Sequence, residues 1–173
     1  MKWIKIFTVC VSLITLLWGC DLTPQLLQTT PIPTIVPCFD CVRMETTINK
    51  HNFILNEPIT MTVTLIKVTE KPHVSHLHEV TPLQTYIIKI FDQTGAEVPL
   101  TQTAIDTLTP SGSRILLNLT PGYPFSETFN IANWYQGSQS GVYTVTVEDV
   151  VIGEGRNLIP LTSPPLTFTL TVD

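Results

Sequence analysis

Gly141-Val142-Tyr143-Thr144-Val145-Thr146-Val147 is the stretch that decides the fold. Its apolar and threonine side chains alternate with a period of two, which predicts a β-strand with one face in a core. Residues 166–172 repeat this alternation near the C-terminus. Both stretches are rich in β-branched and aromatic residues, which favour strands over helices. They predict a protein built from β-sheets.

The same pattern recurs along the chain and predicts six further strands. These segments are 42–49, 59–65, 83–91, 97–104, 113–119 and 125–131. Turn signals such as Asp92-Gln93-Thr94-Gly95 and Pro121-Gly122 separate them. The sequence contains no pattern of an amphipathic helix of ordinary length. A single helical turn is predicted, at residues 131–135. Seven to eight strands with turns between them predict an all-β fold, an antiparallel β-sandwich of immunoglobulin-like (Ig-like) type.

The first twenty residues have the pattern of an export signal. Lys2 and Lys5 supply positive charge, and the following stretch 6–18 is mostly apolar. A charged start followed by an apolar run of this length is typical of a cleavable signal peptide. A membrane-spanning helix needs about 20 apolar residues, so the run is short for a permanent anchor. An uncleaved signal anchor is the alternative interpretation.

The end of this run resembles the bacterial lipobox. That motif has an aliphatic residue three positions before a cysteine and a small residue just before it, which Leu17, Gly19 and Cys20 match. The resemblance implies cleavage between Gly19 and Cys20 and attachment of lipid to the Cys20 thiol. Two or more acyl chains hold a protein stably on a bilayer. We therefore expect a lipoprotein anchored in the cell membrane and facing the periplasm or the exterior.

The chain thus divides into a signal peptide (1–19), a lipidated cysteine with a Pro/Thr-rich linker (20–41) and an Ig-like domain (42–173). The linker's prolines favour an extended spacer, although its apolar residues leave open that it packs along the domain. Removal of residues 1–19 takes away two lysines and no acid, so the net charge of −5 becomes −7. An acidic protein is poorly suited to bind nucleic acid.

Two cysteines stand at the start of the domain, in the order Cys38-Phe39-Asp40-Cys41. In an exported protein, a disulfide between Cys38 and Cys41 is the favoured interpretation. A thioredoxin-like redox pair needs a βαβ context, and a metal site needs two more ligands.

Three of the four histidines lie close together, as His73, His76 and His78, and Glu79 follows them. His76 and His78 would share one face of an extended segment, and His73 and Glu79 could complete a site. Imidazole and carboxylate ligands suit Zn or Cu(II), so one hypothesis is a metal-binding lipoprotein. The competing interpretation is an exposed polar loop without any cofactor, because the spacing matches no closed metal motif.

No combination of nucleophile, acid and base is legible, so we do not expect an enzyme. Glu148, Asp149 and Glu154 cluster near one loop, where either a solvated edge or a weak Ca²⁺ site is conceivable. Trp134 and Tyr135 form either an exposed platform for a sugar or a protein, or a plug at the bottom of the sandwich.

Segments 56–59, 91–99, 119–122 and 141–145 resemble, in their order, bacterial extracellular Ig-like modules. The layout is also similar to that of BsuPI-type proteinase-inhibitor domains, and Tyr143 resembles the tyrosine-corner residue of Ig-like sandwiches. The resemblance implies a non-enzymatic binding or structural module, whose partner is an envelope protein or an extracellular ligand. Proteinase inhibition is the alternative that this layout implies.

Overall fold

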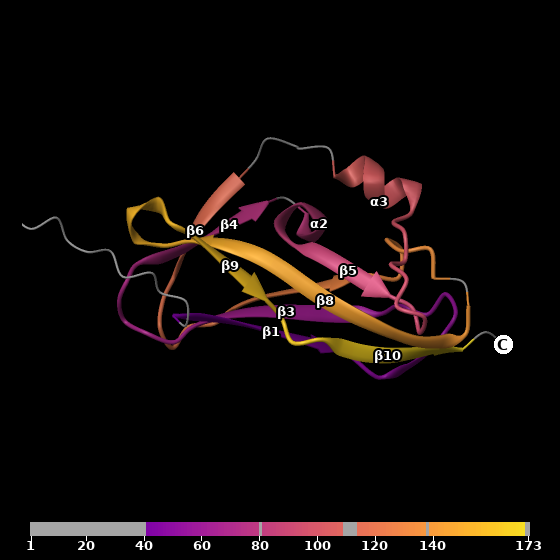
Figure 1. Ribbon diagram of the computed structural model, residues 1–173. Helices are drawn as coiled ribbons and strands as arrows, with labels where there is room; N and C mark the ends of the chain where they lie inside the picture. The colour runs from indigo at the N-terminus through magenta and orange to yellow at the C-terminus, as the bar shows by residue number, and fades with distance from the viewer. Residues whose placement is uncertain (1–40, 80, 109–113, 138, 172–173) are drawn as a thin grey trace, which may run out of the picture. The chain divides into compact units, whose positions relative to one another are not determined.

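Two β-sheets form the part of the chain that this computed structural model describes, residues 41–79, 81–108, 114–137 and 139–171 (Figure 1). These residues belong to one compact unit, 35–173. The predicted signal peptide, Cys20, most of the linker and Cys38 lie outside the described residues.

The described residues contain ten strands and three short helical segments. The strands are β1 (Val42–Ile48), β2 (Asn52–Ile54), β3 (Thr60–Lys67), β4 (Val74–Glu79), β5 (Ile87–Phe91), β6 (Arg114–Leu119), β7 (Phe125–Asn130), β8 (Gly141–Ile152), β9 (Leu158–Thr162) and β10 (Leu166–Thr171). The helical segments are α2 (Pro82–Thr85), α3 (Gln102–Thr107) and the 3₁₀ turn η1 (Glu154–Arg156). None of the described helices is long and apolar enough to cross a membrane.

The smaller sheet has the order β1-β3-β7, and both of its strand pairs are antiparallel. Its middle strand, β3, buries Met61, Val63 and Leu65 completely. The threonines between them face outward, where Thr62 and Thr64 share hydrogen bonds with hydroxyl side chains of β7. The predicted alternation is therefore the alternation that divides core from solvent.

The larger sheet is organised around the long strand β8. β10 and β9 pair along one side of β8, and β5 and β4 pair along the other. β2 extends the sheet beyond β10 as its one parallel pair, and β6 extends it beyond β4. Val145, Val147 and Val151 on β8 are fully buried and face the smaller sheet across the core. The architecture is an all-β, Ig-like sandwich, as the sequence predicts.

Tyr143 forms the tyrosine corner that the Ig-like resemblance implies. Its side chain is buried, and its hydroxyl donates to the backbone carbonyl of Gln139 at 2.8 Å, four residues upstream. This bond ties the loop before β8 to the strand, as in other sandwiches with this feature.

Two predicted strands differ from the structure. Segment 97–104 is not a strand, because Thr101 starts helix α3 there; its side-chain oxygen accepts a hydrogen bond from the backbone N–H of Ala104 at 3.2 Å. Segment 83–91 begins with helix α2, for which Pro82 at the first position is well suited. Only its second half, Ile87–Phe91, is a strand.

The strands β2, β4 and β9 are not among the predicted ones. β2 has only three residues, β4 carries two histidines where apolar residues are expected, and β9 contains Pro160. Pro160 is tolerated because β9 pairs with β8 alone among the described strands.

The chain enters the sandwich at Cys41 and crosses it along β1. The carbonyl of Cys41 accepts from the N–H of Val68 at 2.9 Å, and the register of β1 against β3 runs from Val42 opposite Lys67 to Ile48 opposite Met61. The loops that follow β1 therefore lie at the opposite end of the sandwich from Cys41 (Figure 1).

Candidate functional site

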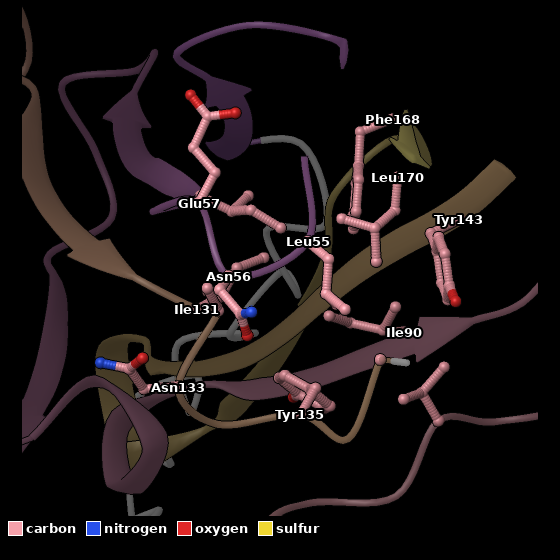
Figure 2. Close-up of a pocket in the computed structure, with 14 residues that line it drawn as sticks. Leu55, Asn56, Glu57, Ile90, Ile131, Asn133, Tyr135, Tyr143, Phe168 and Leu170 are labelled. Carbon is pink, nitrogen blue, oxygen red and sulfur yellow. The ribbon is translucent and has the colours of Figure 1, made fainter. Parts of the chain in front are cut away.

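A pocket of about 180 Å³ opens at the end of the sandwich opposite Cys41 (Figure 2). Its walls are mostly apolar side chains from strands β5, β8 and β10 of the larger sheet and from the loops beside them. They include Leu55, Ile90, Ile131, Phe168 and Leu170. A well-formed apolar pocket with few polar groups is the default candidate for a binding site.

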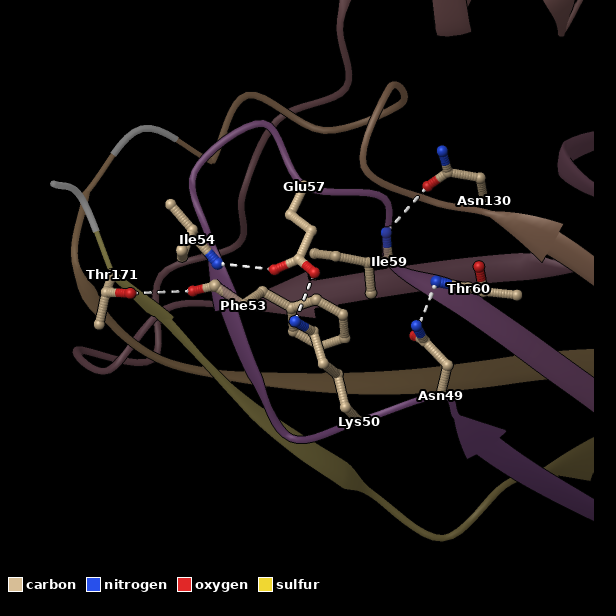
Figure 3. Close-up of polar contacts among 9 residues, drawn as sticks. All are labelled: Asn49, Lys50, Phe53, Ile54, Glu57, Ile59, Thr60, Asn130 and Thr171. Carbon is tan, nitrogen blue, oxygen red and sulfur yellow. Dashed lines mark hydrogen bonds and ion pairs between the residues drawn. The ribbon is translucent and has the colours of Figure 1, made fainter.

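The loop 55–59, which forms one side of the pocket, is held by Glu57 (Figure 3). The Glu57 carboxylate forms an ion pair with Lys50 and accepts a hydrogen bond from the backbone N–H of Ile54 at 3.1 Å. These contacts, the Lys50 bond first, hold the pKa of the Glu57 carboxyl below its usual range. The carboxylate is thus engaged in holding its own loop.

Two asparagines hold the end of this loop and the start of β3 (Figure 3). Asn130 Oδ1 accepts from the backbone N–H groups of Ile59 and Ala132 at 3.1 and 3.0 Å. Asn49 Oδ1 accepts from the N–H of Thr60 at 3.1 Å. Because these bonds connect separate segments, the pocket is formed before any ligand binds.

The two tyrosines of the pocket present rings rather than free hydroxyl groups. The Tyr135 hydroxyl donates to the carbonyl of Ile88 at 2.6 Å, and the Tyr143 hydroxyl donates to Gln139. Burial, with a further contribution from the charge of Glu97, raises the pKa of Tyr135 well above its usual range. Both hydroxyls are used inside the protein, so the pocket wall is apolar at these positions.

Asn56 and Asn133 contribute the uncharged polar groups of the pocket (Figure 2). Asn56 has φ of 69°, a left-handed conformation that asparagine tolerates better than most residues. A carboxamide can both donate and accept a hydrogen bond. The arrangement can therefore hold an apolar group whose polar neighbour is neutral, such as an amide or a hydroxyl.

The predicted histidine site is arranged differently from the expectation. His76 and His78 do lie on one face of β4, with ring centroids 6.1 Å apart and Phe125 packed against both. His73 is exposed, and Glu79 points to the other face of the strand, where it pairs with Arg114 at 2.6 Å. The four side chains do not converge on one point.

Each inward-facing histidine instead has a carboxylate of its own. His76 Nε2 lies 3.0 Å from Asp149 Oδ2, and both side chains are almost completely buried. His78 Nδ1 lies 3.6 Å from Glu127 Oε2 at the less buried edge. In the described part of the chain, no group of three or more His, Cys, Asp or Glu side chains is arranged to hold a metal ion.

Tyr86 completes this buried polar group. Its ring stacks on His76 with a centroid distance of 5.8 Å. Burial, followed by the negative charges of Glu127 and Asp149, raises the pKa of the Tyr86 hydroxyl far above its usual range. We refer to His76, His78, Tyr86, Glu127 and Asp149 as the histidine–carboxylate cluster.

The remaining predicted site residues occupy varied positions. Trp134 is half-buried and stacks on Phe129 at 5.3 Å, whereas Tyr135 is buried and lines the pocket. Cys41 is disulfide-bonded, and the other three cysteines of the chain lie outside the described residues. Gly19 and Cys20 also lie outside them.

The three acids predicted near one loop separate in the structure. Glu148 pairs with Lys89 at 2.8 Å, Glu154 is exposed, and Asp149 points into the core. Sequence reasoning did not identify Asp149 as the partner of His76. The signal was present, because Asp149 is in phase with the buried Val145, Val147 and Val151.

The pocket itself was also missed, because its walls come from segments far apart in the sequence. No local pattern marks Leu55, Ile90 and Leu170 as neighbours. Of the residues that line the pocket, Tyr135 was singled out beforehand as one of two candidate binding aromatic residues, and Tyr143 as the tyrosine-corner residue.

Comparisons with known proteins give no assignment. No family model matches the chain, and no curated protein matches it. Among solved structures, the structural-genomics target SoR45 has a TM-score of 0.42 at 11% identity, over 76% of this chain and 89% of that one. The seventh ScaB type I cohesin from Pseudobacteroides cellulosolvens has a TM-score of 0.23 at 10% identity, over 76% and 92% of the two chains.

Proposed function

We propose that this protein is a lipid-anchored envelope lipoprotein that displays a non-enzymatic Ig-like binding module. In this proposal, Cys20 carries the acyl chains, the linker is a spacer, and the pocket in Figure 2 takes an apolar group of an extracellular or envelope ligand. The observation that carries the proposal is the pocket, with its preformed apolar wall and its two carboxamides.

A binding role suits this pocket better than catalysis. Its ionisable side chains are already engaged, because Glu57 is paired with Lys50 and both tyrosine hydroxyls donate to backbone carbonyls. A general acid or base needs a group that is free to exchange a proton with substrate. The volume of about 180 Å³ suits a single ring or a branched aliphatic group, since an engineered cavity of about 150 Å³ binds benzene.

The position of the pocket fits display from a membrane. The linker precedes Cys41 in the sequence, and β1 runs from there toward the end of the sandwich where the loop 55–59 lines the pocket (Figure 1). A domain held at Cys41 would present the pocket away from the anchored end. A soluble or envelope ligand could then reach it without passing the linker.

The pocket is tested by filling it. In the Gly137→Leu variant, the added Cβ would lie 3.8 Å from Leu170, which is ordinary contact, while the rest of the side chain enters the pocket. N-acetyl-phenylalaninamide serves as the probe, with binding followed by NMR chemical shifts. We expect shifts at Ile131 and Leu170 in the native protein and in Gly137→Ala, and their loss in Gly137→Leu. Equal binding by Gly137→Leu, or no binding by any variant, would count against this site.

The anchor is tested by metabolic labelling with palmitate in a bacterial host. Cys20→Ala should abolish the label and release the protein from the membrane fraction. Cys10→Ala is the matched control, since this cysteine lies inside the apolar run and should have no role in acylation. Retained label in Cys20→Ala would refute the anchoring proposal.

Proteinase inhibition is a second candidate, favoured by the exposed and rigid turn after β5. Asp92 Oδ1 accepts from the backbone N–H groups of Thr94 and Ala96 at 2.8 and 3.0 Å and from the Thr94 hydroxyl at 2.6 Å. These bonds, the Thr94 hydroxyl first, hold the pKa of the Asp92 carboxyl below its usual range. A panel of serine, cysteine and metalloproteases tests this role. No inhibition at micromolar protein would remove it.

A further inference from the structure

Among the strands that the structure describes, β6 ends the larger sheet with one unpaired edge. It is last in the order β2-β10-β8-β4-β6, and among the described strands it pairs only with β4. Ile115 and Leu116 in its middle are 58% and 56% exposed. An exposed apolar edge strand offers its N–H and C=O groups to another strand.

The other edges of the described sheets carry the protections that natural proteins use. β9 contains Pro160, and β2 has only three residues. The edge of β5 is covered, because the N–H of Val98 donates to the carbonyl of Ile90 at 2.8 Å. β1 and β7 carry charged side chains, among them Glu45 and Glu127.

β6 has none of these protections between residues 115 and 119. This segment, Ile-Leu-Leu-Asn-Leu, contains no proline and no charge. Arg114 precedes it and is engaged with Glu79 of β4. An apolar, uncharged and unbulged edge is costly for a monomer to retain, because it invites aggregation. Its retention therefore points to a strand that covers it.

We propose that β6 pairs with β6 of a second copy of this chain, antiparallel and about a twofold axis at Leu116. In this register Leu116 lies opposite Leu116 of the second copy on one face. Ile115 lies opposite Leu117 of the second copy on the other face, and Arg114 lies opposite Asn118. Directly opposite side chains on one face are the pairs that stabilise a sheet.

The sequence of β6 selects this register over its neighbours. A twofold axis at Ile115 would oppose Arg114 with Leu116, and an axis at Leu117 would oppose Leu116 with Asn118. Only the axis at Leu116 matches every apolar residue of segment 115–117 with another apolar residue. The contact is self-complementary, so it closes as a dimer and does not propagate. It is independent of the pocket and of what the pocket binds.

Site-directed cross-linking of the full chain in bacterial membranes tests the register. Directly opposite residues of an antiparallel pair have Cα atoms about 4.5–5.5 Å apart, which is within disulfide range. Leu116→Cys should therefore form a covalent dimer when membranes are oxidised with copper phenanthroline. Ile115→Cys is the matched control, because it is equally exposed but faces a different residue. It should cross-link only when it is co-expressed with Leu117→Cys.

Sedimentation of the detergent-solubilised full chain gives a second measurement. We expect a concentration-dependent dimer for the native chain and loss of the dimer in Leu116→Lys. Leu158→Lys, on β9 and at a side chain that is 70% exposed, should leave the dimer intact. A native chain that stays monomeric, or cross-linking of Ile115→Cys alone as strong as that of Leu116→Cys, would overturn the proposal.

Discussion

Removal of the Asp149 carboxylate should destabilise the domain more than the loss of any exposed charge. His76 Nε2 lies 3.0 Å from this carboxylate, with side chains 0% and 4% exposed. Asp149→Ala leaves the buried imidazole without the carboxylate beside it, and a buried polar group left unpaired costs about 1–3 kcal/mol. It also removes the acceptor of the Val150 N–H at 2.7 Å.

Urea unfolding of the purified protein, followed by circular dichroism, measures this loss. With a denaturant slope of about 2 kcal/mol per molar urea for a domain of this size, the urea midpoint should fall by about 1 M. Glu127→Ala is the matched control. In this second pair, His78 Nδ1 lies 3.6 Å from Glu127 Oε2, and the two side chains are 24% and 19% exposed. Because this pair is partly exposed and its two atoms lie farther apart, its loss should cost less than that of the His76–Asp149 pair, about 1 kcal/mol.

A double replacement separates the loss of a partner from the loss of the pair. Combining His76→Leu with Asp149→Val removes both polar groups, and buried pairs replaced by apolar residues often recover or exceed native stability. We expect a midpoint close to that of the native protein. The reasoning is refuted if Asp149→Ala costs less than about 1 kcal/mol, or if it costs no more than Glu127→Ala.

Two further predictions concern the tyrosines and helix α3. Burial raises the pKa of Tyr86 and Tyr135 in the folded state. The stability that these two tyrosines contribute is therefore complete below about pH 10, which is the pKa of an unfolded tyrosine. It is lost as the pH rises further. Absorbance at 295 nm during an alkaline titration should show two of the four tyrosines ionising only on unfolding, and ordinary midpoints for both would contradict this. Thr101→Ala should cost about 1 kcal/mol by removing the N-cap of α3. The exposed Thr103→Ala should cost almost nothing, and equal costs in a thermal melt would argue against the cap.

The sequence pattern was sufficient for the fold class and for the strands with regular alternation. β3 and β8 were predicted because their apolar and threonine side chains alternate, and Tyr143 because of its place after Gly141. β4 was missed because its core positions hold His76 and His78, whose burial depends on acids from β7 and β8. The pairing of these histidines with acids on other strands cannot be predicted from the local hydropathy pattern.

Helix α3 and the pocket could not be predicted from the sequence for the same reason, because both depend on tertiary contacts. Segment 97–104 was predicted as a strand, yet Thr101 caps a helix, and its hydroxyl also donates to the carbonyl of Asn133 at 3.0 Å. The pocket forms where loop 55–59 meets β5 and β10. Both depend on partners more than 30 residues away, so neither could be read from a short window.

The crossing of the sandwich by β1 has a mechanical consequence. A tension between the linker at Cys41 and a ligand held at the far pocket would run along β1 rather than across it. All seven residue pairs of β1 and β3 would then be loaded together in shear and would not separate one after another. These pairs run from Val42–Lys67 to Ile48–Met61. A module tethered in this way would resist flow or pulling at the cell surface better than its small size suggests.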